Sequence, residues 1–189
     1  MTRTQRGRTA NGAERGRTLL LIRHARDRSA TDTRHLSTIG RLQSYVASCV
    51  LRRRAYDAVQ PIRFLASPEP RAQQTARILF GRKSIITDER LREIRGYRPG
   101  PPRTRSASSN ELVECWRGFT RRISGFVSEF EAGFGSTVGV THRGVFDAVL
   151  EIVTHAATPA ELDPRHLGVL HLEYRPGNKS GAWLLRSCR

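Results

Sequence analysis

The chain has 189 residues, enough for one domain with a buried core, and 38% of them are hydrophobic. No apolar run is long enough to cross a bilayer and no apolar signal-peptide core precedes residue 18, so we expect a cytoplasmic protein with no membrane contact. The net charge of +16 attracts anions, but the arginines are scattered and not interleaved with aromatic residues, which disfavours nucleic acid as a partner. The three cysteines lack metal-ligand spacing, so no metal site is expected.

The first 17 residues are polar, basic and without an apolar face. This composition predicts a disordered tail. The remaining residues, 18–189, are expected to form a single domain.

Segments with the character of strands and of helices alternate along that domain. Short apolar runs predict strands buried in a sheet, and apolar residues three to four positions apart predict helices. The strands are expected at residues 18–23, 62–66, 85–87, 137–141, 169–174 and 183–185, and the helices at about residues 38–53, 71–79, 110–130 and 145–153. The order predicts an α/β fold, a three-layer α/β/α sandwich around a mostly parallel sheet.

Two segments have features of their own. Ser37 and Thr38 can cap the first helix, and the Pro-, Arg- and Ser-rich residues 97–109 predict a loop. Apolar side chains share one face of the first helix: Leu42, Tyr45, Val46, Cys49 and Val50.

Cationic or potentially cationic residues follow three of the predicted strands. Arg23 and His24 follow the first strand, Arg71 comes shortly after the second, and His142 follows the strand at 137–141. In parallel sheets, functional sites collect beyond the carboxyl ends of the strands, so these side chains should meet at one edge. Two guanidinium groups and two imidazoles would repel one another there, but they suit a tetrahedral phosphate dianion. A neutral imidazole is also a competent nucleophile toward phosphorus.

Five blocks of the sequence, in order, resemble the motifs of the histidine phosphatase superfamily, also called the phosphoglycerate-mutase-like family. The resemblance covers roughly residues 18–185 and implies the phosphoglycerate-mutase-like fold. The blocks are LLLIRHA (19–25), HLSTIGRLQS (35–44), LASPEPRAQQTARIL (65–79), DERLREI (88–94) and VGVTHRGVFDAVL (138–150).

The resemblance implies a role for each matching residue. His24 would be the nucleophile that becomes phosphohistidine, and Arg23, Arg71 and His142 would hold the phosphoryl oxygens. Glu93 would protonate the leaving alcohol and then activate the attacking water. No metal ion or organic cofactor is implied, because the arginines and imidazoles supply the positive charge.

The assignment of the acid has alternatives. Glu93 can also be interpreted as a surface carboxylate paired with Arg92 or Arg95, in which case Asp27 or Glu69 could replace it as the proton donor.

The chain departs from the family pattern at several positions. Ala25 replaces the glycine after the first histidine, a small change, whereas Arg143 replaces the glycine after the second, where it could add a phosphate contact or fill the pocket. Arg26 and Ala30 lie near the places where an acidic residue and an asparagine often occur.

Within the family, the sequence favours a phosphomonoester hydrolase. Only 48 residues separate Glu93 from His142, too few for the cap that the cofactor-dependent mutases carry. The expected partner is a small phosphorylated substrate or a phosphoprotein. A phosphoglycerate-type mutase and a non-catalytic member that binds a phosphorylated ligand are the alternatives.

Overall fold

The structure is a computed structural model, and it describes residues 16–28, 34–54, 62–94, 114–133, 135–155, 165–177 and 181–188. The predicted loop at 97–109 lies outside the described residues, as does the predicted tail except for Gly16 and Arg17.

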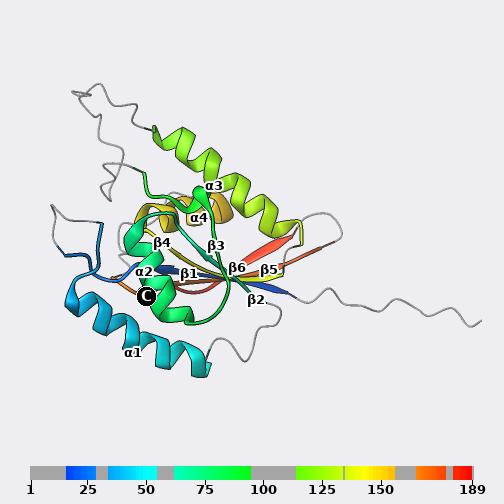
Figure 1. The fold of residues 1–189 in the computed structure, drawn as a ribbon. Helices are drawn as coiled ribbons and strands as arrows, with labels where there is room; N and C mark the ends of the chain where they lie inside the picture. Colours follow the sequence, from blue (N-terminus) through cyan, green and yellow to red (C-terminus); the bar gives the residue numbers. More distant parts are fainter. Residues whose placement is uncertain are drawn as a thin grey trace, which may run out of the picture.

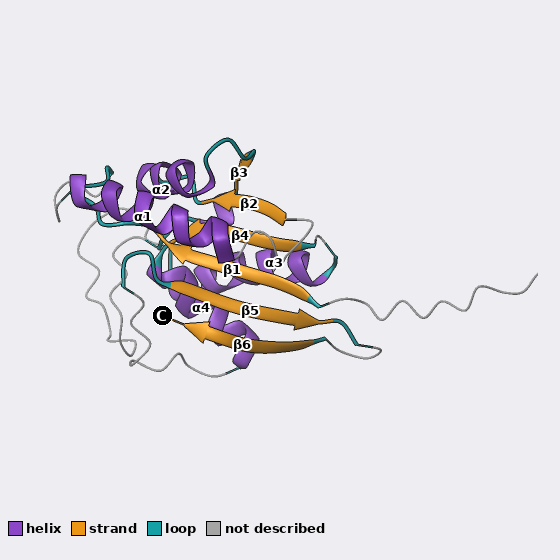
Figure 2. Cartoon of the chain, turned by 90° about the horizontal axis from the view of Figure 1, so that it is seen from below, coloured by secondary structure: helices purple, strands orange, loops and turns teal. Residues whose placement is uncertain are grey.

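The strands of the described residues form one mixed sheet in the order β3-β2-β4-β1-β5-β6 (Figure 2). The pairs β1–β4, β4–β2 and β2–β3 are parallel, whereas β5 runs antiparallel to β1 and to β6. The strands are β1 (Arg17–Arg23), β2 (Ile62–Ala66), β3 (Ile85–Thr87), β4 (Ser136–Thr141), β5 (Val169–Arg175) and β6 (Ala182–Cys188). The predicted strands are confirmed, and the sheet is parallel where the strands belong to β-α-β units.

Two helices cover each face of the sheet, which gives the predicted three layers (Figure 1). On one face lie α1 (Thr38–Arg54) and α2 (Pro70–Phe80), and on the other α3 (Trp116–Glu131) and α4 (Arg143–Thr154), with a 3-10 turn, η1 (Glu89–Leu91), beside α3. None of the helices among the described residues combines the length and the apolar character that crossing a membrane requires.

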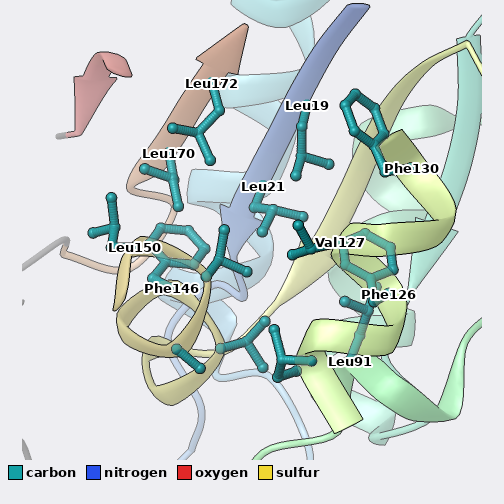
Figure 3. Close-up of a cluster of buried hydrophobic side chains, with 14 of the residues drawn as sticks. Leu19, Leu21, Leu91, Phe126, Val127, Phe130, Phe146, Leu150, Leu170 and Leu172 are labelled. Atoms are coloured by element: carbon teal, nitrogen blue, oxygen red, sulfur yellow. The ribbon is translucent and has the colours of Figure 1, made fainter. Parts of the chain in front are cut away.

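Strand β1 is buried on both faces, which is why its apolar run in the sequence is uninterrupted. Leu19 and Leu21 face the core beneath α3 and α4, whereas Leu20 and Ile22 face the core beneath α2. Figure 3 shows the first of these cores, where Leu19 and Leu21 lie among aromatic side chains such as Phe126 of α3. A strand covered on both faces needs apolar residues at every position.

Helix α3 begins later than predicted. It starts at Trp116 with Cys115 as the N-cap residue, whereas the sequence pattern extended the helix from Asn110. Glu114, just before the cap, accepts a hydrogen bond of 3.0 Å from Nε of Arg122. That contact ties Glu114 to the side of the helix.

Helix α1 turns its small residues inward. The Ser37 hydroxyl accepts a hydrogen bond from the Gly40 N–H at 2.9 Å, which confirms Ser37 as a cap. A Cβ atom at Gly40 would lie 2.1 Å from the Arg26 carbonyl oxygen, so this position accepts only glycine. Ser44 is fully buried and Ser48 nearly so, which leaves the apolar face noted in the sequence exposed to solvent.

Candidate active site

The carboxyl ends of β1, β2 and β4 lie next to one another and carry the predicted residues. The backbone N–H of His24 donates to the Thr141 carbonyl at 2.9 Å, and that of Ser67 donates to the Val140 carbonyl at 2.9 Å. These bonds continue the parallel pairing beyond the ends of β1 and β2. The imidazole rings of His24 and His142 therefore lie close together, with 5.1 Å between their centroids.

His24 is held as a neutral imidazole in a defined tautomer. Its side chain is only 5% exposed, and burial, with the nearby Arg71 charge as the next cause, lowers its pKa from 6.5 to about 3. Nδ1 lies 2.8 Å from the Ala25 carbonyl oxygen, which can only accept a hydrogen bond. Nδ1 must therefore carry the proton, and Nε2 keeps the lone pair that a nucleophile needs.

The loop that carries His24 is fixed to α2. The N–H of Ala25 donates to the Thr75 hydroxyl oxygen at 3.1 Å, and the Thr75 hydroxyl donates to the Arg71 carbonyl at 2.8 Å. Ala25 itself is fully buried, so the methyl group that replaces the family's glycine fits in the packed loop. Thr75 thus couples the position of His24 to that of Arg71.

His142 is the N-cap residue of α4 and is fully buried. Its Nε2 lies 2.8 Å from the Ser67 hydroxyl. Burial is the main cause of a pKa well below 6.5, with the His24 and Arg71 charges acting in the same direction. The repulsion expected between two cationic imidazoles is avoided because both rings are neutral.

Arg71 lies in the first turn of α2, between two carboxylates. Its Nη2 is 2.7 Å from Oε2 of Glu69, and its Nη1 is 3.6 Å from Oδ2 of Asp27. The other oxygen of Glu69 is 3.9 Å from Nε2 of His142. Glu69 therefore bridges two of the groups that the family resemblance assigns to phosphoryl binding.

Arg23 lies at the end of β1, where β5 begins. Its N–H donates to the Gly168 carbonyl at 2.9 Å and its carbonyl accepts from the Leu167 N–H at 3.1 Å. After burial, its charge is one of the causes that lower the pKa of both His24 and His142.

Glu93 is not a surface carboxylate. Its two oxygens accept hydrogen bonds from the N–H groups of Ile94 at 3.0 Å and Gly144 at 3.1 Å, whereas Arg92 pairs with Glu89 at 2.6 Å. Arg95, the other partner considered, lies outside the described residues. Burial outweighs the two N–H donors and raises the pKa of Glu93 from 4.5 to about 7. Its protonated and ionised forms are therefore both populated near neutral pH.

Arg143 is paired within its own helix. Its Nε lies 3.1 Å and 3.0 Å from the two carboxylate oxygens of Asp147, and both residues are buried. The residue that replaces the family's second glycine thus packs with a partner one turn along α4.

The sequence interpretation missed His166. Its ring centroid is 5.4 Å from that of His24, and its Nδ1 donates to the His24 carbonyl oxygen at 3.2 Å. Burial and then the Arg23 charge lower its pKa below 6.5. His166 precedes β5, and the start of an antiparallel strand lies at the same edge as the end of its neighbour β1. The predicted strand beginning at Val169 was the signal that could have located it.

Among the described residues, no group of three or more His, Cys, Asp or Glu side chains is arranged to hold a metal ion. The described part of the site instead combines neutral imidazoles, guanidinium groups and a carboxyl group with a raised pKa.

Comparison with known proteins concerns the family and the fold of the chain. The family model described as histidine phosphatase superfamily (branch 1) matches residues 19–183. No curated protein sequence matches the chain.

Solved structures show the same fold. The native mycobacterial glucosyl-3-phosphoglycerate phosphatase is 22% identical, with a TM-score of 0.65 over 91% of this chain and 98% of that one. A phosphoserine phosphatase from Entamoeba histolytica, in complex with 3-phosphoglyceric acid, is 16% identical, with a TM-score of 0.65 over 91% and 96% of the two chains. A phosphoglycerate mutase from Bacillus anthracis str. Sterne is 15% identical, with a TM-score of 0.64 over 91% and 92%. At these identities the likeness concerns the fold alone.

Proposed function

The chain belongs to the histidine phosphatase superfamily, and on that basis we propose that it is a phosphomonoester hydrolase that acts through a phosphohistidine on His24. The observation that carries the proposal is the state of His24, whose Nδ1 is bonded to a carbonyl and whose pKa is lowered to about 3. A buried, neutral imidazole with a free Nε2 lone pair needs no deprotonation before it attacks phosphorus.

In the first step, Nε2 of His24 forms a bond to phosphorus while the bond from phosphorus to the ester oxygen breaks. Arg23, Arg71 and His142 hold the phosphoryl oxygens, and protonated Glu93 gives its proton to the departing alcohol. In the second step, Glu93 accepts a proton from water as that water attacks phosphorus. The phosphorus–nitrogen bond breaks, and inorganic phosphate and free His24 result.

The two roles of Glu93 require both of its protonation states within one cycle. A pKa raised to about 7 supports this, because neither state is costly to reach near neutral pH. The charges of the site come from side chains of the chain, so we propose turnover without a metal ion or an organic cofactor.

The experiment is a trap of the phosphoenzyme combined with a substrate screen. The wild-type protein, quenched during turnover of a radiolabelled phosphomonoester, should carry one acid-labile, base-stable phosphoryl group. His24→Ala should carry none and should lose phosphatase activity while remaining folded. His155→Asn, a change at an exposed histidine, is the control and should behave as wild type. Full activity of His24→Ala would refute the mechanism.

The screen should name the substrate, for which a small phosphorylated molecule or a phosphoprotein is proposed. Phosphoserine, glucosyl-3-phosphoglycerate and phosphohistidine peptides belong in it, each with and without EDTA. Activity that EDTA leaves unchanged is expected. Phosphoryl transfer to 3-phosphoglycerate that depends on a bisphosphoglycerate primer would instead identify a mutase. Binding of these compounds without turnover would identify a non-catalytic member.

A further inference from the structure

Helix α1 exposes most of its large apolar side chains. Ile39, Leu42, Tyr45, Val46 and Val50 are each between 50% and 64% exposed, and Cys49 is exposed as well. Among the described residues, the other exposed large hydrophobic side chains are Ile86, Leu184 and Leu185, on β3 and β6. The exposed apolar surface is therefore concentrated on one helix.

These residues form a continuous face. They follow one another at helical spacing, so their side chains lie along one side of the helix. The opposite side, with Gly40, Ser44 and Ser48, is buried and fits closely against its neighbours. The register of α1 is thus fixed by its small residues, and rotating the helix to bury the apolar face would lose that fit. We call Ile39, Leu42, Tyr45, Val46, Cys49 and Val50 the α1 face.

Charge indicates what the α1 face contacts. Helix α1 contains no Asp or Glu, but it has an exposed Arg41 and ends in Arg52–Arg54, in a chain with a net charge of +16. It lies next to α2 on one face of the sheet, with Ala47 and Leu51 packed against the core there and its other side outward (Figures 1 and 2). A basic helix with an outward apolar face is typical of binding in the plane of an anionic lipid surface.

A second copy of the chain fits the α1 face poorly. A helix of 17 residues is about 25 Å long and about 10 Å wide, so its face offers about 250 Å². A stable interface buries about 800 Å² on each partner. Pairing two α1 helices would also bring together their arginines with no acidic residue on either helix. A lipid surface has neither limitation, because it extends beyond the helix and supplies phosphate groups.

We propose that α1 docks the protein on an anionic phospholipid surface. The α1 face enters the boundary between headgroups and acyl chains, and the positive charge of the helix attracts the lipid phosphates. This replaces the expectation of no membrane contact, which considered membrane-spanning segments and targeting peptides only. It stands apart from the proposed hydrolase activity, because none of the α1 face belongs to the candidate site.

Docking through α1 would also bring the rim of the site toward the lipid. The N–H and the hydroxyl of Ser37 both donate to the Arg26 carbonyl, at 2.9 Å and 3.1 Å. Gly40 lets the start of α1 approach the same carbonyl closely. Arg26 lies two residues after His24, so the beginning of the docking helix is fixed to the loop that carries the nucleophile.

The test must separate the apolar contact from simple charge attraction, since a chain of +16 is drawn to any anionic surface. The full-length protein, with Cys115→Ser and Cys188→Ser, is labelled at Cys49 with an environment-sensitive dye. It is mixed with vesicles of phosphatidylglycerol and phosphatidylcholine or of phosphatidylcholine alone. The double variant Leu42→Gln/Val46→Thr keeps the net charge but makes the face polar. Ile86→Thr, at an exposed apolar residue of β3, is the matched control.

We expect a blue shift of the dye with anionic vesicles and none with neutral ones, together with at least tenfold weaker vesicle binding of the double variant. Ile86→Thr should bind as wild type, and thermal unfolding of both variants confirms that they fold. Equal binding of the double variant and wild type would refute the proposal, because charge alone would then explain the binding. A wild-type dimer that dissociates in the double variant, or a protein partner that alone protects Cys49, would also overturn it. None of these outcomes depends on phosphatase activity.

Discussion

Replacing His24 should change how stability depends on pH, and the sign follows from its environment. The pKa of the native imidazole is lowered from 6.5 to about 3, so the unfolded chain takes up a proton at a higher pH than the native protein does. The contribution of His24 to the free energy of unfolding is fully present above pH 6.5 and is lost as the pH falls toward 3. His24→Asn removes the titrating group, so the variant should resist acid better than wild type does.

The magnitude at pH 5 depends little on the native pKa. At that pH the unfolded imidazole is almost fully protonated and the native one almost fully neutral. Relative to pH 8, the wild type should therefore lose about 2 kcal/mol that His24→Asn does not lose. Glu93 and His142 also titrate with shifted pKa values, but they remain in both proteins and largely cancel in the comparison.

Urea unfolding at pH 8 and pH 5 measures this difference directly. His155→Asn is the matched control because His155 is exposed and has a left-handed backbone, with a φ of 54°, which asparagine tolerates. The control should follow wild type at both pH values. Equal losses of stability in wild type and His24→Asn between pH 8 and pH 5 would show that His24 is not a buried neutral imidazole. The reasoning that makes His24 the nucleophile would then be refuted.

Two further substitutions test the groups around His24. Glu93→Gln should slow hydrolysis of alkyl phosphates by about 10²- to 10⁴-fold but affect phosphoryl transfer from p-nitrophenyl phosphate much less, since p-nitrophenolate leaves without a proton. A p-nitrophenol burst in this variant would locate the defect in the water step, and unchanged rates in both steps would place the acid elsewhere. Arg71→Lys should lower kcat/KM by about 10²- to 10³-fold, because one ammonium cannot replace the planar guanidinium. Near-normal kcat/KM in Arg71→Lys would show that Arg71 does not bind the phosphoryl group and only pairs with Glu69.

The sequence predicted the strands well where both faces of the sheet are covered by helices. Strand β1, with Leu19 to Ile22 buried, could be located from an apolar run alone, because both faces of a central strand require apolar residues. The rule that sites collect at the carboxyl ends of parallel strands then placed His24, Arg71 and His142 together, and the rings of the two histidines do lie 5.1 Å apart.

Contacts that depend on side-chain fit could not be predicted in this way. The apolar face of α1 would ordinarily be turned inward, but close packing of Gly40 and Ser44 determined the orientation instead. His166 comes from a short segment with no periodicity, and only the antiparallel direction of β5 brings it beside His24. Arg143 and Asp147 are four residues apart on α4, so the sequence permits an ion pair between them. Whether the Arg143 side chain forms this pair or extends into the phosphate pocket depends on its conformation, which the sequence does not determine.

The surroundings of the three carboxylates near the site favour Glu93 as the proton donor. Glu69 and Asp27 lie 2.7 Å and 3.6 Å from the guanidinium of Arg71 and form ion pairs with it, whereas Glu93 is bonded to backbone N–H groups. The Glu69 charge is moreover one of the causes, after burial, that raise the pKa of Glu93. Glu69, which is paired with Arg71, thus helps to keep a proton on Glu93. Removing the Glu69 charge would lower the pKa of Glu93, so that less of Glu93 is protonated near neutral pH, and would also remove an ion-pair partner of Arg71. The two glutamates should therefore be regarded as one unit.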